Sequence, residues 1–134
     1  MKKLIILTML FSTMLPSDFT NNGATVTIQE GVIVTMIGSF ENNGVVNNFG
    51  SMSVSGDFTN TGDSNFDPSS QFTLDGEDQI FPSLTYGNFT IDGSGTKSMS
   101  GDCLVNGFAL NSGILAINEH ALTIDGVITY DGGY

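Results

Sequence analysis

The sequence predicts an all-β protein, more specifically a parallel β-helix (β-solenoid) built of short repeats. Three observations lead to this prediction. The phrase [FL]-T-[LI]-D-G recurs at 72–76, 89–93 and 122–126. A second phrase, F-x-N-x-G, recurs at 19–23, 40–44 and 58–62. No stretch after residue 17 sustains the apolar spacing of an amphipathic helix.

Each phrase contains a short strand followed by a turn. In residues 72–76, Phe72 and Leu74 lie two residues apart, so their side chains face the same side of a strand. Asp or Asn and then Gly follow, and these residues tolerate the positive φ angles of turns. Units of 14–21 residues cannot bury an apolar face alone, but they can do so by stacking on their neighbours.

An antiparallel β-sandwich is the alternative fold, because Asn-Gly and Asp-Gly are also the residues of tight hairpins. The repeat interval is longer than a hairpin requires. The same residue types also recur in the same order, as a coil needs when Phe stacks on Phe inside and Asn on Asn at a corner. We therefore favour the coil.

The repeats also predict the core. Residues 63–71 interrupt the pattern, and we expect them to form a loop within one domain. We expect the following side chains to be buried and stacked: Phe19, Phe40, Phe58, Phe72, Phe89, Ile91, Cys103, Val105, Leu122 and Ile124.

The N-terminus resembles a secretory signal peptide over residues 1–17, which leaves residues 18–134 as a single β-repeat domain. Lys2 and Lys3 precede an uncharged apolar run from Leu4 to Leu15. That run is too short for a helix that spans a membrane, which needs about 20 residues. We expect a secreted or cell-surface protein that lacks residues 1–17 when mature and has no stable membrane span.

The charge excludes several partners. The net charge of the whole chain is −11, and without Lys2 and Lys3 a single lysine stands against 14 Asp and Glu, a net charge of −13. Nucleic acids and anionic membranes attract basic surfaces, so neither is an expected partner. A single cysteine, Cys103, provides no internal disulfide.

One segment is similar to the start of a calcium-binding loop. Asp63, Asn65 and Asp67 form D-x-N-x-D, in which alternate oxygen ligands converge on one ion. The later positions of an EF-type loop are not matched, since Pro68 and Leu74 stand where Gly and Glu belong. Calcium at these three residues is the one metal hypothesis, and no other cofactor is expected.

We do not expect an enzyme. Glycoside hydrolysis needs two carboxyl groups beside the scissile bond. The candidate pairs are Glu77 with Asp78 and Asp57 with Asp75, and a polysaccharide lyase would have only Lys97 to neutralise its substrate.

Two further candidate functions concern nucleophilic catalysis and glycan binding. His120 is the only histidine, and neither a Ser-His-Asp triad nor a pair with Cys103 is supported by a local motif. A carbohydrate-binding module or a carbohydrate-active β-helix enzyme is the alternative to a structural role. The candidate platforms on which a sugar could stack are Phe66, Phe81, Tyr86 and Tyr130.

Two stretches, residues 39–62 and 84–126, resemble the repeats of large secreted and surface proteins of Bacteroidota. The resemblance covers most of residues 19–129 and implies an adhesin-like β-solenoid with a structural or adhesive role, as a spacer, stalk or binding surface for glycans or other surface proteins. Many such proteins carry a C-terminal sorting domain for type IX secretion, whereas this sequence stops at Tyr134. The resemblance therefore implies either a part of a longer array or a different route of display.

The end of the sequence carries an apolar strand, residues 127–130, followed by only four residues. A parallel coil leaves backbone groups unpaired at its last turn, and such edges invite association. We therefore expect self-association through open ends of the solenoid.

Overall fold

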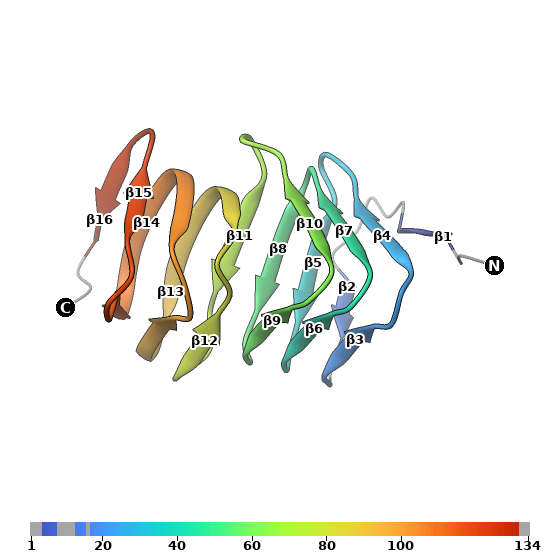
Figure 1. Ribbon diagram of the computed structural model, residues 1–134, viewed down its shortest axis with the longest axis horizontal. Coiled ribbons are helices and arrows are strands. Elements are labelled where there is room, and N and C mark those ends of the chain that lie inside the picture. Colours follow the sequence, from blue (N-terminus) through green and yellow to red (C-terminus); the bar gives the residue numbers. More distant parts are fainter. Residues whose placement is uncertain (1–3, 8–12, 16, 132–134) are drawn as a thin grey trace.

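The protein is a parallel β-solenoid whose turns stack along the long axis of the molecule (Figure 1). The computed structural model describes residues 4–7, 13–15 and 17–131. Every pair of hydrogen-bonded strands in this part of the chain is parallel. The predicted coil is thereby confirmed, and the antiparallel sandwich is excluded.

Three sheets run along the solenoid, and in the N-terminal turns each sheet occupies one side of the coil. The first contains β1 (Leu4–Leu7), β4 (Thr25–Ile28), β7 (Val45–Asn48) and β10 (Asp63–Phe66). The second contains β2 (Thr13–Leu15), β5 (Ile33–Met36), β8 (Ser51–Val54), β11 (Gln71–Leu74), β13 (Thr85–Met99), β14 (Cys103–Ala116) and β15 (Leu122–Ile124), with β12 (Gln79–Phe81) paired to β13 and β16 (Ile128–Tyr130) paired to β14. The third contains β3 (Phe19–Asn21), β6 (Phe40–Asn42) and β9 (Phe58–Asn60).

One turn of the coil contributes one strand to each side. Strands β4, β5 and β6 form such a turn, and β7, β8 and β9 form the next. In later turns the corners are themselves extended, so β13 and β14 each continue around the coil as one long strand. The register between these two strands shifts after Ile91 and again after Asp92, which lets them bend at the corner.

At the N-terminal end, the solenoid continues into the segment that resembles a signal peptide. β1 pairs with β4, and β2 pairs with β5. The sequence predicts a β-repeat domain that begins at residue 18, whereas β1 and β2 add strands to its sheets. The physical reason is that an extended apolar segment can satisfy its backbone groups by adding to an open sheet edge. Removal of the segment on export stays a prediction.

Aromatic rings stack inside the coil from turn to turn. The ring centroids of Phe19 and Phe40 lie 5.7 Å apart, and those of Phe40 and Phe58 lie 5.0 Å apart. The stack of Phe72 on Phe89, at 5.6 Å, continues the same arrangement in later turns. The predicted stacking of Phe on Phe is confirmed.

Most of the predicted core is fully buried. The buried members are Phe40, Phe58, Phe72, Phe89, Ile91, Cys103 and Val105. Phe19, Leu122 and Ile124 are only partly buried. These three residues belong to β3 and β15, which are the end strands of their sheets, so each has a paired strand on one side only among the described residues.

Asparagine side chains form a second ladder at one corner. Asn21 Nδ2 donates a hydrogen bond to Asn42 Oδ1 at 2.7 Å, and Asn42 Nδ2 donates to Asn60 Oδ1 at 2.7 Å. Asn21 and Asn42 are buried. Each amide also bonds backbone groups of the corner, as in the bond from the Ala24 amide to Asn21 Oδ1. The predicted stacking of Asn on Asn is confirmed, and it satisfies polar groups where the chain turns.

Most glycines of the repeated phrases serve a different purpose from the one predicted; Gly23 does have the predicted positive φ, at 85°. Gly44, Gly62, Gly76 and Gly93 do not have positive φ. A Cβ at each of them would overlap a backbone atom of the preceding turn; at Gly76 this atom is the Ser55 carbonyl oxygen. At these four positions glycine is therefore required because successive corners stack closely, and not because the turn needs a left-handed conformation.

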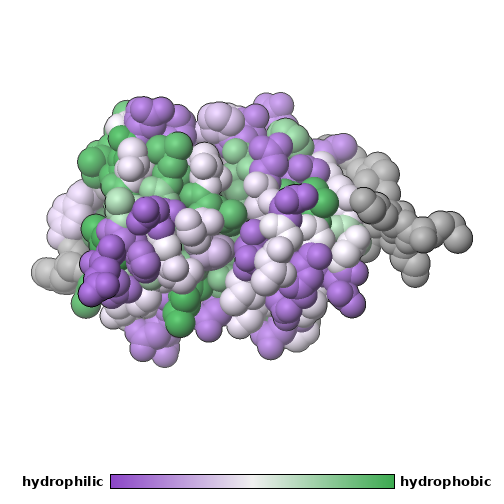
Figure 2. Space-filling model, in the orientation of Figure 1, coloured by the Kyte–Doolittle hydropathy of each residue, from purple (hydrophilic) through white to green (hydrophobic). Residues whose placement is uncertain are grey.

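At the C-terminal end, several apolar side chains are exposed. Figure 2 shows apolar surface gathered over the C-terminal turns. The exposed apolar residues of this region are Leu104, Ile114, Ile117, Val127 and Ile128. Self-association through the ends of the solenoid stays a prediction.

Candidate functional site

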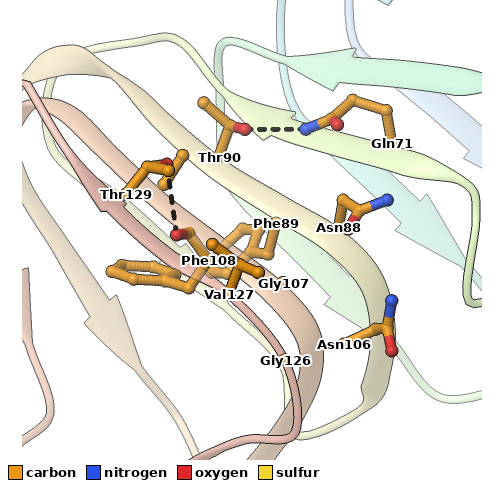
Figure 3. Close-up of a pocket in the computed structure, with 11 residues that line it drawn as sticks. Gln71, Asn88, Phe89, Thr90, Asn106, Gly107, Phe108, Gly126, Val127 and Thr129 are labelled. Atoms are coloured by element: carbon orange, nitrogen blue, oxygen red, sulfur yellow. Dashed lines mark hydrogen bonds between the residues drawn. The ribbon is translucent and has the colours of Figure 1, made fainter.

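A groove crosses the second sheet near its C-terminal end, along β14 (Figure 3). It has a volume of about 370 Å³. Its floor exists because the outward residues of β14 at this point are Gly107 and Ala109, which carry almost no side chain. In the neighbouring strand β13, the residues in register with Gly107 and Ala109 are Asn88 and Thr90.

The opposite wall is formed by the strand that follows. Thr129 of β16 lies in register with Ala109, and Val127 immediately precedes that strand. The flanking strands β13 and β16 are two strand spacings apart, or about 10 Å. The groove is thus one strand wide and follows the direction of β14.

Amide side chains along one wall are held by hydrogen bonds through their nitrogen atoms. Asn106 Nδ2 donates to the Pro68 carbonyl at 3.0 Å, and Asn88 Nδ2 donates to the Ser69 carbonyl at 3.5 Å. Gln71 Nε2 donates to Thr90 Oγ1 at 2.7 Å, as Figure 3 shows. The three amide carbonyl oxygens accept no hydrogen bond from the described residues, so they remain available to a ligand.

This groove is lined by uncharged residues only, on a protein with a net charge of −11. Two other depressions on the surface contain acidic residues in their lining. One is lined by Asp57 and Asp78, and the other by Asp18, Glu41 and Asp57. The groove along β14 is therefore a neutral surface on an acidic protein.

The register of the strands explains why the sequence did not reveal this groove. In the sequence, residues 103–107 (CLVNG) align with the phrases at 72–76 and 89–93, and this alignment predicts that Cys103 stacks with Phe72 and Phe89. In the structure, Phe72 lies in register with Phe89 and Phe89 with Phe108, whereas Cys103 pairs with Leu122. The alignment was therefore wrong: copies of one phrase lie on different sides of the coil. Only the correct register places Gly107 beside Asn88.

Two of the three predicted calcium ligands, Asp63 and Asn65, lie on a strand and not in a loop, and Asp67 follows that strand. Residues 63–66 form β10, which pairs with β7, so the predicted loop over residues 63–71 was wrong in its first half. Asp63 and Asn65 are exposed, and the Asp67 carboxylate accepts hydrogen bonds from the amide and the hydroxyl of Ser69 at 2.9 and 2.5 Å. These two bonds lower the pKa of the Asp67 carboxyl.

The alternation of a strand explains the D-x-N-x-D spacing. Asp63 and Asn65 point outward, while Phe66 is buried. Within the part of the chain that the structure describes, no three His, Cys, Asp or Glu side chains are grouped to hold a metal ion. Calcium at Asp63, Asn65 and Asp67 stays a prediction.

The candidate catalytic carboxylates all make structural hydrogen bonds, with the exception of Glu77. Asp57 Oδ1 accepts from the Ile80 amide and Asp78 Oδ1 from the Thr96 amide, both at 2.8 Å. Asp75 Oδ1 accepts from the Ser55 hydroxyl at 2.7 Å. These carboxylates join one turn to the next.

Asp57 and Asp78 belong to a series of turn-to-turn contacts that the sequence did not predict. Asp18 Oδ1 accepts from the Ser39 amide and Asp102 Oδ1 from the Ala121 amide, each at 2.8 Å. In each pair the acceptor precedes the donor by about one turn. The only signal in the sequence is a short acidic or hydroxyl side chain at a corner.

The two residues considered for nucleophilic catalysis lie in different environments. Cys103 is buried, and its burial raises the pKa of the thiol, which favours the unreactive protonated form. His120 is half-buried in the turn before β15. No hydrogen bond joins the two side chains, since the Cys103 thiol lies against the carbonyls of Pro82 and Gly101.

Three of the four proposed glycan-stacking platforms are unavailable. Phe66, Phe81 and Tyr86 are buried in the core, and the Tyr86 hydroxyl donates to the Pro82 carbonyl at 2.8 Å. Their role as platforms is therefore excluded, because a sugar cannot reach them. Tyr130 is exposed at the end of β16.

Lys97 is completely buried, with 0% of its surface exposed. Its ammonium group donates to the carbonyl oxygens of Gly76 at 2.9 Å and Ser94 at 2.5 Å, and also to that of Glu77. Lys97 therefore closes a corner of the coil from inside and is not available to neutralise an acidic substrate.

The described residues contain no helix that is long and apolar enough to cross a membrane. No protein-family model, curated protein or solved structure shows significant similarity to the chain.

Proposed function

We propose that this protein is a segment of an exported bacterial surface or extracellular protein, and that it acts as a rigid spacer or stalk. The turn-to-turn ladders are the observation that supports this role. Phe stacks on Phe and Asn bonds Asn in the same register from β3 to β6 to β9. Each added turn therefore extends the rod without a new kind of contact, so length follows directly from the number of repeats.

The length of the rod provides the test. Residues 43–60 form a complete turn, because Asn42 and Asn60 occupy equivalent positions. Inserting four further copies of residues 43–60 after Asn60 should lengthen the molecule by about 19 Å, at 4.8 Å per turn. Small-angle X-ray scattering measures the maximum dimension, and far-ultraviolet circular dichroism checks that the added residues form β structure.

A matched insertion controls for added mass. In the control, the copies carry Phe58→Ser and Asn60→Ser, which remove both ladders from the inserted turns. This protein should gain a flexible segment and no rigid length. If the two insertions give the same scattering profile, or if the first gives a compact particle, the ladders do not build a rod and the spacer function is wrong.

Export rests on the N-terminal sequence and on the resemblance of the repeats to those of surface proteins. The basic start followed by a short apolar run is typical of a secreted leader. Mass spectrometry of protein from the medium or surface of a native host should find chains that begin near residue 18. Secreted protein that retains Met1 would rule out cleavage.

A further inference from the structure

We propose that the groove along β14 binds an uncharged oligosaccharide. This goes beyond the spacer function, because a rod needs no ligand. It also differs from glycan stacking on Phe66, Phe81 or Tyr86, which are buried. The groove consists instead of side-chain amides, hydroxyls and a small apolar wall.

The chemistry of the lining matches the chemistry of a sugar. Hydroxyl groups of a sugar are both donors and acceptors, and Asn, Gln and Thr side chains complement them. The carbonyl oxygens of Asn88, Asn106 and Gln71 accept nothing from the described residues, while their nitrogens are anchored to the protein. Anchoring fixes the direction of the acceptors before a ligand arrives, which lowers the entropy lost on binding.

An apolar wall completes the site. Val127 has 71% of its surface exposed and lies across the floor from Asn88. One face of a pyranose ring consists of C–H groups, which pack on such a side chain while the ring edge meets the amides. The volume of about 370 Å³ falls within the range of 300–1,000 Å³ that is usual for ligand sites.

Charge selects a neutral sugar over an acidic one. No cation lines the groove. Lys97, the only cationic Lys or Arg side chain among the described residues, is buried at a distant corner. The excess of carboxylates on the rest of the surface repels polyanions. A uronic acid polymer would find no partner for its carboxylates, whereas a neutral chain meets no such cost.

Two variants separate binding in the groove from binding elsewhere. Ala109→Leu fills the floor with a larger side chain that points outward. Ser53→Leu is the matched control: it places the same residue in the same outward row, because Ser53, Thr73, Thr90 and Ala109 are in register across β8, β11, β13 and β14. Both variants bury nothing new in the core, so both should fold as the parent does.

The experiment uses nuclear magnetic resonance of the ¹⁵N-labelled protein with cellohexaose, laminarihexaose, mannohexaose and hexagalacturonate as probes. We expect at least one neutral hexaose to shift the side-chain amide signals of Asn88, Asn106 and Gln71, and hexagalacturonate to leave them unchanged. Ala109→Leu should weaken the binding at least tenfold, and Ser53→Leu should not change it.

Several outcomes would overturn the proposal. They are the absence of shifts with all three neutral hexaoses at millimolar concentration, tighter binding of hexagalacturonate, and equal binding by the Ala109→Leu and Ser53→Leu variants. None of these outcomes affects the spacer function, which is tested by the length of the rod alone.

Discussion

Replacing Phe89 by Ala should lower the free energy of unfolding by about 3–5 kcal/mol, the range found for large aromatic residues in cores. The ring of Phe89 stacks on Phe72 and Tyr86, with centroid distances of 5.6 and 5.1 Å. It also contacts Phe81 at 5.1 Å and Phe108 at 6.0 Å. The substitution leaves a cavity among four rings that belong to three successive turns, and these turns cannot collapse independently.

Chemical denaturation monitored by circular dichroism measures the change. Phe49→Ala is the matched control, because Phe49 is 38% exposed. That control should cost less than about 1 kcal/mol, since little apolar surface is removed from a buried site. Equal losses for the two variants would show that the ring stack of Phe89 contributes no special stability.

Replacing Lys97 by Met should lower the free energy of unfolding by about 2–4 kcal/mol, because three carbonyl oxygens lose their donor inside the protein. Met keeps the length and the apolar stem of the side chain, so the cost measures the lost hydrogen bonds. The preceding turn offers a natural comparison. Gln79 is in register with Lys97, and its Nε2 donates to the carbonyls of Val54 at 2.8 Å and Gly56 at 2.5 Å.

Lys97→Gln is therefore the conservative control, and it should recover about half of the loss because an amide can make two of these bonds. If Lys97→Met and Lys97→Gln unfold at the same denaturant concentration, the donors do not contribute and the ammonium group is merely tolerated.

We also expect the difference in stability between the parent and Lys97→Met to depend on pH. Burial lowers the pKa of the Lys97 ammonium group, and Asp78, Asp75 and Glu77 oppose this change. Between the lowered pKa and the ordinary lysine value of 10.5, the unfolded chain binds more protons than the folded protein. The stability of the parent should therefore rise relative to Lys97→Met as the pH increases through this window.

Comparing the two proteins at each pH removes the effect of Tyr86 and Cys103, whose pKa values are raised by burial and which titrate alike in both. A difference in stability that shrinks with rising pH would contradict the direction given for Lys97.

The ladders were predictable from the sequence, and the side of the coil on which each phrase lies was not. Phe19, Phe40 and Phe58 recur with the same neighbours, and like stacks on like when a coil repeats. The phrase [FL]-T-[LI]-D-G, however, specifies only a strand and a corner. Because any side of the coil can use a strand and a corner, Leu122 aligned with Phe89 in sequence but not in space.

The groove and the buried lysine could not be predicted, for a related reason. Gly107 and Ala109 matter because side chains are missing where the strands on either side carry them, and this is visible only once the register is known. Lys97 is a charged residue among polar residues, and such a residue is usually expected at the surface. Its burial depends on carbonyl groups from the preceding corner. Neither property is local in sequence.

The ladders also have a consequence for how the chain folds. The pairings of Phe19 with Phe40 and of Phe40 with Phe58 join residues 21 and 18 positions apart, and similar separations hold along the rod. No turn can form its sheet hydrogen bonds alone, so the first event is the meeting of two adjacent turns, with the entropy cost of closing one such loop. Each later turn then adds to an existing template at a similar cost. Folding therefore proceeds like crystal growth in one dimension: nucleation is slow, extension is fast, and the last turns added are the first to come apart.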